Sequence, residues 1–502
     1  MLGSILSACN TVENTSKEDK FEFLVERFAE FRILKYQVPG FDELSLNQKK
    51  LIYYLSQAAL CGRDIIYDQN GKYNLMVRHS LENIYQTYTG NKENEEYKAF
   101  VVYLKKVWFS NGIHHHYGMD KFVPGFTPAY MDGLIANSDK NGFPLMGGQN
   151  LDAFKELLHK VIFDKDYMAK RVNLDPSKDL VASSACNFYL GVDQHEAENF
   201  YASMKDTDDT TPISHGLNSR LVKENGILKE EVYKLGGLYG EAIEKIIFWI
   251  EKALPYAETE HQQQELNKLI AYYKTGDLET WDEYNVLWVT DTVPLVDYVN
   301  GFIEVYGDPL GMKATWESIV NFKNMEATRR TKLISENAQW FEDNSPVAPV
   351  FKKKKVKGVT GKVITVAQLA GDCYPATPIG INLPNANWIR KEHGSKSVTI
   401  ENITYAYDQV MLESGFLDEF AYNEDEKELI KKYGSVTSNL HTDLHEILGH
   451  GSGQLLPGVS DDALKNYHST LEETRADLFA LYYIYDQKLV DLGVLPEVDA
   501  AK

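Results

Sequence analysis

Residues 444–453 read L-H-E-I-L-G-H-G-S-G, and the spacing of the two histidines in this stretch constrains the fold. It holds His445 and His450, with Glu446 directly after the first histidine. In the common zinc helix H-E-x-x-H, the two histidines lie four residues apart and leave one face. Five residues of an ideal α-helix turn about 500°, so the second ring points about 140° away from the first. The two rings converge only if the helix takes in one extra residue, as a π-bulge does.

Glycines within and after this pair fit such a distortion. Gly449 stands next to His450, where a residue without Cβ tolerates irregular backbone best. We expect Gly451 and Gly453 to end the helix. Two alternatives stay open: the histidines are unrelated, or His441, four residues before His445, pairs with it on a regular helix.

A third candidate ligand follows in L-E-E-T-R-A-D, where Glu473 heads an apolar segment. Catalytic zinc takes three protein ligands and keeps one open position, and two histidines with one glutamate form a known set. Either glutamate of this motif also fits a capping box, from Ser469 to Glu472 or from Thr470 to Glu473. We predict that one glutamate is the ligand and that the other is a cap or supports a ligand.

H-E-I-L-G-H followed by E-E-T-R-A-D resembles the two signature motifs of the dipeptidyl peptidase III family, zinc exopeptidases with an H-E-x-x-G-H helix. The resemblance implies one Zn²⁺ ion bound by His445, His450 and Glu473. It implies that Glu446 is the general base that activates the zinc-bound water. Glu472 is then the residue that supports a ligand from behind.

Two further segments are similar to the family's peptide-binding motifs: residues 301–309 (G-F-I-E-V-Y-G-D-P) and 380–385 (G-I-N-L-P-N). The resemblance implies that Glu304, Asn382 and Asn385 hold the substrate's free amino group and that Tyr306 hydrogen-bonds near the scissile carbonyl. An ammonium has three donors and no acceptor, so one carboxylate with two amide oxygens satisfies it. The alternative is a surface glutamate with two turn asparagines beside Pro384.

Together these motifs predict a zinc-dependent dipeptidyl peptidase that releases dipeptides from the free N-terminus of short peptides. Two alternatives are kept. One is a zinc endopeptidase without N-terminal register. The other is a zinc-containing, peptide-binding chain that does not turn over, because family members continue beyond the E-E-x-R-A-D helix with a further histidine and arginine, whereas this sequence stops at Lys502.

Composition limits the partners. A formal charge of −21 works against nucleic-acid binding, and the one basic run, residues 352–355 with Lys357, is interpreted as a solvated turn before Gly358. Cys9, Cys61, Cys186 and Cys373 are too widely spaced for a disulfide framework or a zinc ribbon. No run approaches the roughly 18 apolar residues of a membrane helix. The oligomeric state is not readable from the sequence.

For the fold class we expect a mixed α+β, mainly helical protein with two lobes around a wide cleft. The resemblance implies that residues 17–325 and 366–412 form a substrate-binding lobe with a small β-barrel. Residues 326–365 and 413–502 would form a helical, zinc-carrying lobe whose C-terminal part is absent. Residues 1–16 are a polar tail. The expected location is cytoplasmic. Leu6-Ser7-Ala8-Cys9 resembles a lipoprotein cleavage site, so the alternative is the cell envelope, through an anchor on Cys9.

Periodicity predicts several elements. Phe21, Leu24, Val25 and Phe28 recur at helical spacing, and Ser45 with Gln48 forms a capping box for a helix that Gly62 ends. Helices are also expected over 243–250 and 266–273, the latter stopped by Gly276, and again from Tyr405 onward. Residues 280–325 mix aromatics with turns, and 350–369 predict a small sheet. His114, His115 and His116 are interpreted as a loop, because adjacent imidazoles do not share one face.

Overall fold

The computed structural model describes residues 21–206, 208–356, 362–375, 377–459 and 468–502. The expected N-terminal tail with Cys9 lies outside the described residues, as do Lys357 and Gly358. No helix in the described ranges is long and apolar enough to cross a membrane.

The N-terminal half is mainly helical. Its elements are β1 (Leu24–Phe28), β2 (Phe31–Leu34), α1 (Leu46–Cys61), α2 (Arg63–Asn70), α3 (Asn74–Thr87), α4 (Glu95–Phe109), α5 (Pro128–Ala136), α6 (Leu151–Phe163), β3 (Tyr189–Leu190), α7 (Gln194–Ala202), β4 (Ser219–Glu224), β5 (Ile227–Val232) and α8 (Gly240–Ala253).

The C-terminal half carries the main sheet and the helices after it. Its elements are α9 (Glu260–Thr275), α10 (Leu278–Thr290), β6 (Val296–Glu304), β7 (Thr315–Lys323), α11 (Met325–Glu336), α12 (Ala338–Asn344), β8 (Lys362–Gly371), β9 (Gly380–Leu383), α13 (Asn387–His393), β10 (Lys396–Ile400), α14 (Glu401–Leu412), α15 (Phe416–Phe420), α16 (Glu424–Leu444), the π-helical turn η5 (His445–Gly449), α17 (His468–Tyr483) and α18 (Gln487–Asp491).

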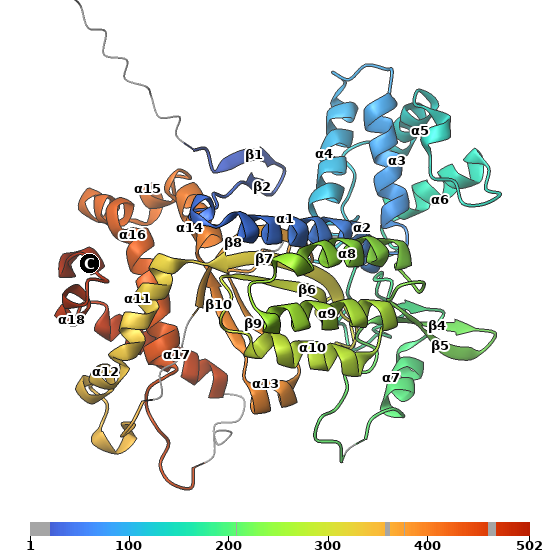
Figure 1. Cartoon of the computed structure of the whole chain (residues 1–502). Coiled ribbons are helices and arrows are strands. Elements are labelled where there is room, and N and C mark those ends of the chain that lie inside the picture. The colour runs from blue at the N-terminus through green and yellow to red at the C-terminus, as the bar shows by residue number, and fades with distance from the viewer. Residues whose placement is uncertain (1–20, 207, 357–361, 376, 460–467) are drawn as a thin grey trace, which may run out of the picture.

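A five-stranded sheet stands at the centre of the molecule, in the order β6-β7-β8-β10-β9 (Figure 1). Its strands run antiparallel except for the parallel pair β8–β10. β6 and β9 form its two edges, so it is an open sheet. The other described sheets have two strands (β1-β2) and three strands (β3-β4-β5). The expected small β-barrel is therefore wrong for the described residues; the fold remains mixed α and β.

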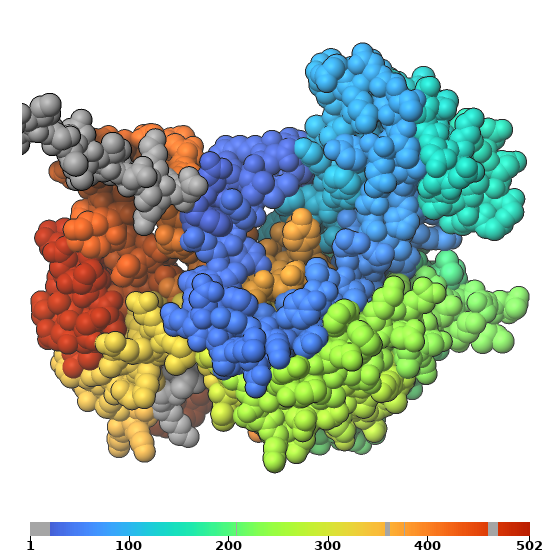
Figure 2. Space-filling view, turned by 45° about the horizontal axis from the view of Figure 1, so that its top comes forward, coloured from blue at the N-terminus to red at the C-terminus, as the bar shows by residue number. Residues whose placement is uncertain are grey.

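Helices cover the sheet and form two further bodies around it. In Figure 1, α1 and α8 cross above the sheet, α3 to α6 gather at the upper right, and α11, α12, α16, α17 and α18 stand at the left. Figure 2 shows a hollow between the N-terminal hairpin and the α3–α4 body, with light orange atoms at its floor.

Three large hydrophobic clusters match these bodies. The central cluster packs α1, α8, α9 and α10 on the sheet, and a second cluster holds residues 28–162. A third joins Ile334 and Phe341 to Leu444, Phe479 and Tyr483, so α11 and α12 pack with the helices that carry the histidine motif. The division into two lobes stays a prediction, since these clusters describe packing and not lobe boundaries.

Several expected boundaries are confirmed. Ser45 accepts from the Gln48 amide in a full capping box at the start of α1, and Gly62 follows its last residue. Gly276, with φ +70°, ends α9. The helix expected from Phe21 is wrong: these residues form the hairpin β1–β2, whose only fully buried members are Phe28 and Phe31.

The region 280–325 differs from expectation as well, because it contains α10 and the long strands β6 and β7. Conversely, residues 362–371 form one strand of the large sheet, not a small sheet of their own. A strand buried on both faces loses the alternation by which strands are recognised. β7 is buried at eight consecutive positions, from Thr315 to Phe322.

Candidate metal centre

The histidine motif begins where α16 changes from α- to π-helical winding. The amide of His450 donates to the carbonyl of His445 at 3.0 Å, a bond that spans five residues. The predicted extra residue is therefore present, in η5. Because of it, both imidazoles leave the same side of the helix, with ring centroids 4.8 Å apart.

Glu473 on α17 meets both rings. Its Oε2 lies 3.2 Å from His445 Nε2 and 3.7 Å from His450 Nε2. One donor atom from each of the three residues lies within 4.8 Å of the others. We call His445, His450 and Glu473 the metal triad. Two imidazole nitrogens and one carboxylate oxygen fit a zinc ion with a further position open, so the residues present suit the expected metal.

The rear nitrogen of each imidazole is also bound. Nδ1 of His450 lies 3.0 Å from Glu472 Oε1, and Nδ1 of His445 lies 3.2 Å from Asp477 Oδ1. A carboxylate at Nδ1 draws the proton there, which leaves the lone pair of Nε2 free for a metal and fixes the ring orientation. Glu472 was placed in this role from the sequence, whereas Asp477 was missed. Its signal was its position four residues after Glu473, on the same helix face.

Arg475 ties the two motifs together and was also missed. Its guanidinium donates twice to Glu472, at 2.7 and 2.9 Å, and once to the carbonyl of Gly449 at 2.8 Å. The hydrogen bonds from Arg475 lower the pKa of the Glu472 carboxyl to about 2, and His450 acts in the same direction against the effect of burial. Glu472 is therefore a fixed anion behind His450 across the neutral range.

Gly449 is needed for close packing between the two motifs. A Cβ on it would stand 2.7 Å from Cα and 2.8 Å from Cβ of Ala476 on α17. Gly449 therefore serves two purposes: it tolerates the irregular backbone, as expected, and it leaves room for Ala476. The backbone after it turns at Gly453, whose φ is +71°.

Buried Glu342 on α12 fixes the same turn by accepting from the Gly453 amide at 3.0 Å. Lys353, from the basic run interpreted as a solvated turn, donates to the carbonyl of Gly451 at 2.7 Å. The backbone that follows the second histidine is thus tied to a neighbouring helix and to the basic run.

Glu446 lies inside the π-helical turn, beside the metal triad, and is half-buried. No hydrogen bond or ion pair to its carboxylate is formed by the described residues. A carboxylate without a partner of its own is free to exchange a proton with water.

The alternatives for this region are resolved in part. His441 is outside the metal triad in the described part of the chain; its Nε2 lies 3.6 Å from Asp477. The capping-box alternative is wrong, because the described part of α17 already begins at His468 and so contains positions 469 and 470. Neither Glu472 nor Glu473 closes the start of that helix.

The residues implied for amine binding come from the two edge strands of the central sheet. Glu304 ends β6, Asn382 belongs to the edge strand β9, and Asn385 follows it. Glu304 and Asn385 are hydrogen-bonded partners. Burial raises the pKa of the half-buried Glu304 carboxyl, although the Asn385 bond opposes the shift. We call Glu304, Asn382 and Asn385 the amine clamp.

Arg390 on α13 holds the clamp's backbone and was missed in the sequence. It donates to the carbonyls of Asn382 at 2.6 Å and Pro384 at 2.5 Å. Its contact with Asn385 Oδ1, at 3.4 Å, is longer. A basic residue five positions after G-I-N-L-P-N was the available signal, and nothing in its spacing indicated which carbonyls it would reach.

Tyr306 lies in the turn after β6 and is 79% exposed. The turn itself is rigid, because the buried Asp308 carboxylate accepts from the amides of Met312 and Lys313 and from the Tyr189 hydroxyl. The structure therefore presents the Tyr306 phenol to solvent from a fixed backbone, without bringing it into contact with the metal triad.

The three adjacent histidines form no metal group in the described part of the chain. His114 is buried, with Nε2 at 2.7 Å from the Met168 carbonyl, and burial lowers its pKa to about 4. His115 and His116 stack on each other with ring centroids 4.7 Å apart.

A model of "Peptidase family M49" matches residues 201–468, which is more than half of the chain and spans both the amine clamp and the histidine motif. This chain belongs to peptidase family M49. Members of that family are metallopeptidases, which agrees with the geometry of the metal triad.

Curated relatives of this M49 chain are named dipeptidyl peptidase 3. The Homo sapiens protein is 25% identical over 447 residues, covering 83% of this chain and 60% of its own length. The Rattus norvegicus protein is 26% identical over 383 residues, covering 72% and 51%. The chain thus spans about half to three-fifths of the length of these relatives.

Solved structures share the fold. The structure of DPP III from Caldithrix abyssi matches with a TM-score of 0.64 at 19% identity, over 92% of this chain and 75% of that one. The dipeptidyl-peptidase III from Corallococcus sp. strain EGB matches with a TM-score of 0.56 at 19% identity, over 92% and 73%.

Proposed function

We propose that this M49 chain is a zinc-dependent exopeptidase that releases dipeptides from the free N-terminus of short peptides. The observation that carries the proposal is the convergence of His445, His450 and Glu473 beside an unpartnered Glu446. The relatives named dipeptidyl peptidase 3 support the exopeptidase class.

The metal triad would hold one zinc ion through His445 Nε2, His450 Nε2 and a Glu473 oxygen. Zinc bound there would supply Lewis-acid polarisation of the peptide carbonyl and would make water a stronger acid. Glu472 and Asp477 orient the two imidazoles from behind, so that little rearrangement is needed when the ion enters.

Glu446 is the general base of the proposal. Its carboxylate removes a proton from the attacking water, and the water oxygen forms a bond to the scissile carbonyl carbon. The same carboxyl then passes that proton to the leaving nitrogen as the C–N bond breaks, so the residue ends the cycle as it began. Tyr306 is proposed to donate its phenolic hydrogen to the oxygen that gains charge in this step.

The amine clamp would set the register of cleavage. A peptide ammonium offers three donors, which the Glu304 carboxylate and the side-chain oxygens of Asn382 and Asn385 can accept. Half-buried Glu304 gains from a cationic partner, because its burial disfavours an isolated charge. Fixing the ammonium at one place fixes the bond that lies over the metal.

Strand β9 offers a way to extend the peptide from that anchor. Among the described residues this edge strand pairs with β10 alone, and Arg390 donates to the Asn382 carbonyl within it. An extended peptide can add to such an edge by main-chain hydrogen bonds, without using its side chains. We propose that residues beyond the ammonium run along β9.

The test is a mass-spectrometric cleavage map of one short peptide, offered with a free and with an acetylated N-terminus. Each form is incubated with the zinc-loaded protein and with the protein treated with a chelator. Chelator-sensitive release of the N-terminal dipeptide from the free form alone is the expected result. Internal cuts in both forms would instead indicate a zinc endopeptidase, and zinc and peptide binding without any cut would indicate a chain that does not turn over.

A further inference from the structure

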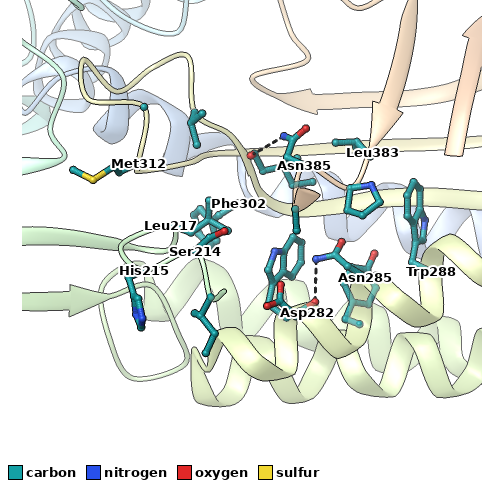
Figure 3. Close-up of a pocket in the computed structure, with 18 of the residues that line it drawn as sticks. Ser214, His215, Leu217, Asp282, Asn285, Trp288, Phe302, Met312, Leu383 and Asn385 are labelled. Atoms are coloured by element: carbon teal, nitrogen blue, oxygen red, sulfur yellow. Dashed lines mark hydrogen bonds between the residues drawn. The ribbon is translucent and has the colours of Figure 1, made fainter. Parts of the chain in front are cut away.

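The metal triad and the amine clamp belong to different bodies of the molecule. Helices α11, α12, α16 and α17 pack with η5 in the third hydrophobic cluster, and we call them the metal body. The clamp lies on the central sheet, where Asn385 donates to the carbonyl of Ile303 in β6 at 3.4 Å (Figure 3). The central and third clusters share no residue in the described ranges, so no continuous apolar core runs from the sheet into the metal body there.

Glu401 supplies a polar link between the two bodies. It is the first residue of α14, directly after β10, and its side chain is mostly buried. Asn439 on α16 donates to its Oε1 at 2.9 Å, and Nη1 of Arg330 on α11 lies 3.6 Å from the same oxygen. Asn324, which caps α11, donates to its Oε2 at 3.1 Å. One carboxylate thus contacts two helices of the metal body and the residue that joins β7 to α11.

Arg330 extends this link to the helix of the metal histidines. Its Nε donates to Asp443 Oδ2 at 2.5 Å, and Asp443 precedes His445 by two residues. Both charged side chains are largely buried. Such a pair keeps its geometry, because separating the partners would leave an uncompensated buried charge. The position of His445 is therefore coupled to α11 and, through Arg330, to Glu401.

The sheet connects the same link to both parts of the clamp. In the order β6-β7-β8-β10-β9, the strands next to the two edges are β7 and β10. β7 pairs with β6, which ends at Glu304, and leads through Asn324 into α11. β10 pairs Ser397 with Asn382 of β9, and Glu401 follows its last residue. Each clamp strand therefore has a neighbour that ends at the Glu401 link.

A cavity of about 350 Å³ borders the link. Arg330, Glu401 and Asn439 all line it. Because side chains do not fill this space, the neighbouring helices have room to shift once the carboxylate is removed. The link therefore restrains a movement that packing on this side permits.

We propose that Glu401 is a positioning residue, which holds the metal body at the distance from the amine clamp that places the second peptide bond over the metal. The inference rests on the proposed function, because it concerns the register between an ammonium site and a metal site. Glu401 belongs to neither site, so its loss leaves both intact and changes how they are placed relative to each other. A displacement of about 1 Å between reacting groups can cost about 100-fold in rate.

The kinetic test compares Glu401→Ala with the wild type. The variant leaves Arg330 paired with Asp443, so no buried charge is left without a partner. We expect kcat for dipeptide release to fall about 10–100-fold and products of other lengths to appear. Zinc affinity and peptide binding to the metal-free protein should stay within about twofold. A parallel loss of zinc affinity would overturn the inference, because Glu401 would then support the triad itself.

Two further variants sharpen the kinetic test. Asn439→Ala removes one contact of Glu401 without changing any charge, and it should lower kcat less than Glu401→Ala does. Glu326→Ala is the matched control, since Glu326 lines the same cavity but is exposed. The control should keep the wild-type kcat, zinc affinity and product length. An equal loss of kcat in Glu326→Ala would assign the effect to the cavity's charge and overturn the inference.

A distance measurement tests the inference without turnover. Nitroxide labels are placed on Ser397→Cys in β10 and Ser438→Cys in α16, two exposed positions, one in the sheet and one in the metal body. Cys9 and Cys61 are replaced by serine, and the other two cysteines are buried. Double electron–electron resonance then reports the distance between sheet and metal body in protein free of metal and peptide.

Glu401→Ala should shift or broaden this distance distribution by roughly 1 Å or more, the displacement that a 100-fold loss of rate implies. Asn439→Ala should act in the same direction, and it carries the test if Glu401→Ala does not fold. Glu326→Ala should leave the distribution unchanged. The wild-type distribution in both link variants would overturn the inference, whether or not the protein cuts peptides. Absence of cleavage in the wild type would instead count against the proposed function.

Discussion

Replacing Gly449 by alanine should separate the two motifs that hold the metal. The new Cβ would lie 2.7 to 2.8 Å from three atoms of Ala476. Carbon atoms pack best at about 3.5–4.0 Å, so α17 must move by roughly 1 Å. Metal–ligand distances tolerate only about 0.2 Å. We expect Gly449→Ala to cost about 1–3 kcal/mol of stability through overpacking and to weaken zinc binding roughly 10–100-fold.

The assay for Gly449→Ala is zinc affinity by competition with a chromogenic chelator, together with the thermal midpoint of the metal-free protein. Gly133→Ala is the matched control, because Gly133 also lies in a helix but a Cβ there meets nothing within 4 Å. The control should be neutral or more stable by up to about 1 kcal/mol, since alanine favours helix more than glycine. If both variants bind zinc as the wild type does, the close contact with Ala476 is not what positions the triad.

The remaining predictions concern the metal triad's neighbours and the amine clamp. Glu446→Gln should keep one zinc per chain and lose dipeptide release by at least about 100-fold, because the general base is gone; loss of zinc, measured by metal analysis, would make Glu446 structural. Glu473→Ala should weaken zinc binding far more than Glu472→Ala in the chelator competition, and the opposite order would exchange their roles. Because burial raises the pKa of Glu304, its carboxylate is lost as the pH falls through that value. Calorimetry should therefore show that a free-amine peptide binds the metal-free protein up to tenfold more weakly for each pH unit below the pKa of Glu304. An N-acetylated peptide should show no such pH dependence. If both peptides show the same pH profile, Glu304 does not belong to the clamp. Binding weakens toward low pH because the peptide amine, with a pKa near 8, stays cationic over this range, and only the Glu304 carboxylate loses its charge.

The ends of helices were well predicted where a capping residue or a glycine marks them. The capping box at Ser45 and the left-handed Gly276 act within a few residues, so the sequence contains the whole interaction. The hairpin β1–β2 shows the limit of periodicity. Its apolar residues fit a helix, but only Phe28 and Phe31 reach the core, through contacts with Phe109 and Phe122 on distant segments.

The central sheet was the largest failure of prediction. β6 and β7 are buried on both faces, and polar residues such as Glu317 and Asn321 are buried with the apolar ones, so polarity along these strands does not mark a solvent-facing side. Whether such a run is a strand depends on which segments cover it. Here α1 and α10 pack in the same core as these strands. α1 is far from both strands in the sequence, whereas α10 directly precedes β6 and is separated from β7 by that strand.

The sequence by itself predicted the candidate metal ligands and showed that their spacing does not suit a regular helix. For both rings to converge, a spacing of five from His445 to His450 requires one extra residue in the turn, which is a property of helix geometry that needs no tertiary context. The identity of Glu473 as the third member depended on its motif, and the structure then placed its oxygen between the two rings.

Tertiary structure alone decided what surrounds those ligands. Asp477 behind His445, Arg475 between the motifs and Arg390 under the amine clamp act through contacts that spacing does not specify. A local turn is fixed by neighbours in sequence, whereas burial and an unpaired carboxyl depend on which distant surfaces meet.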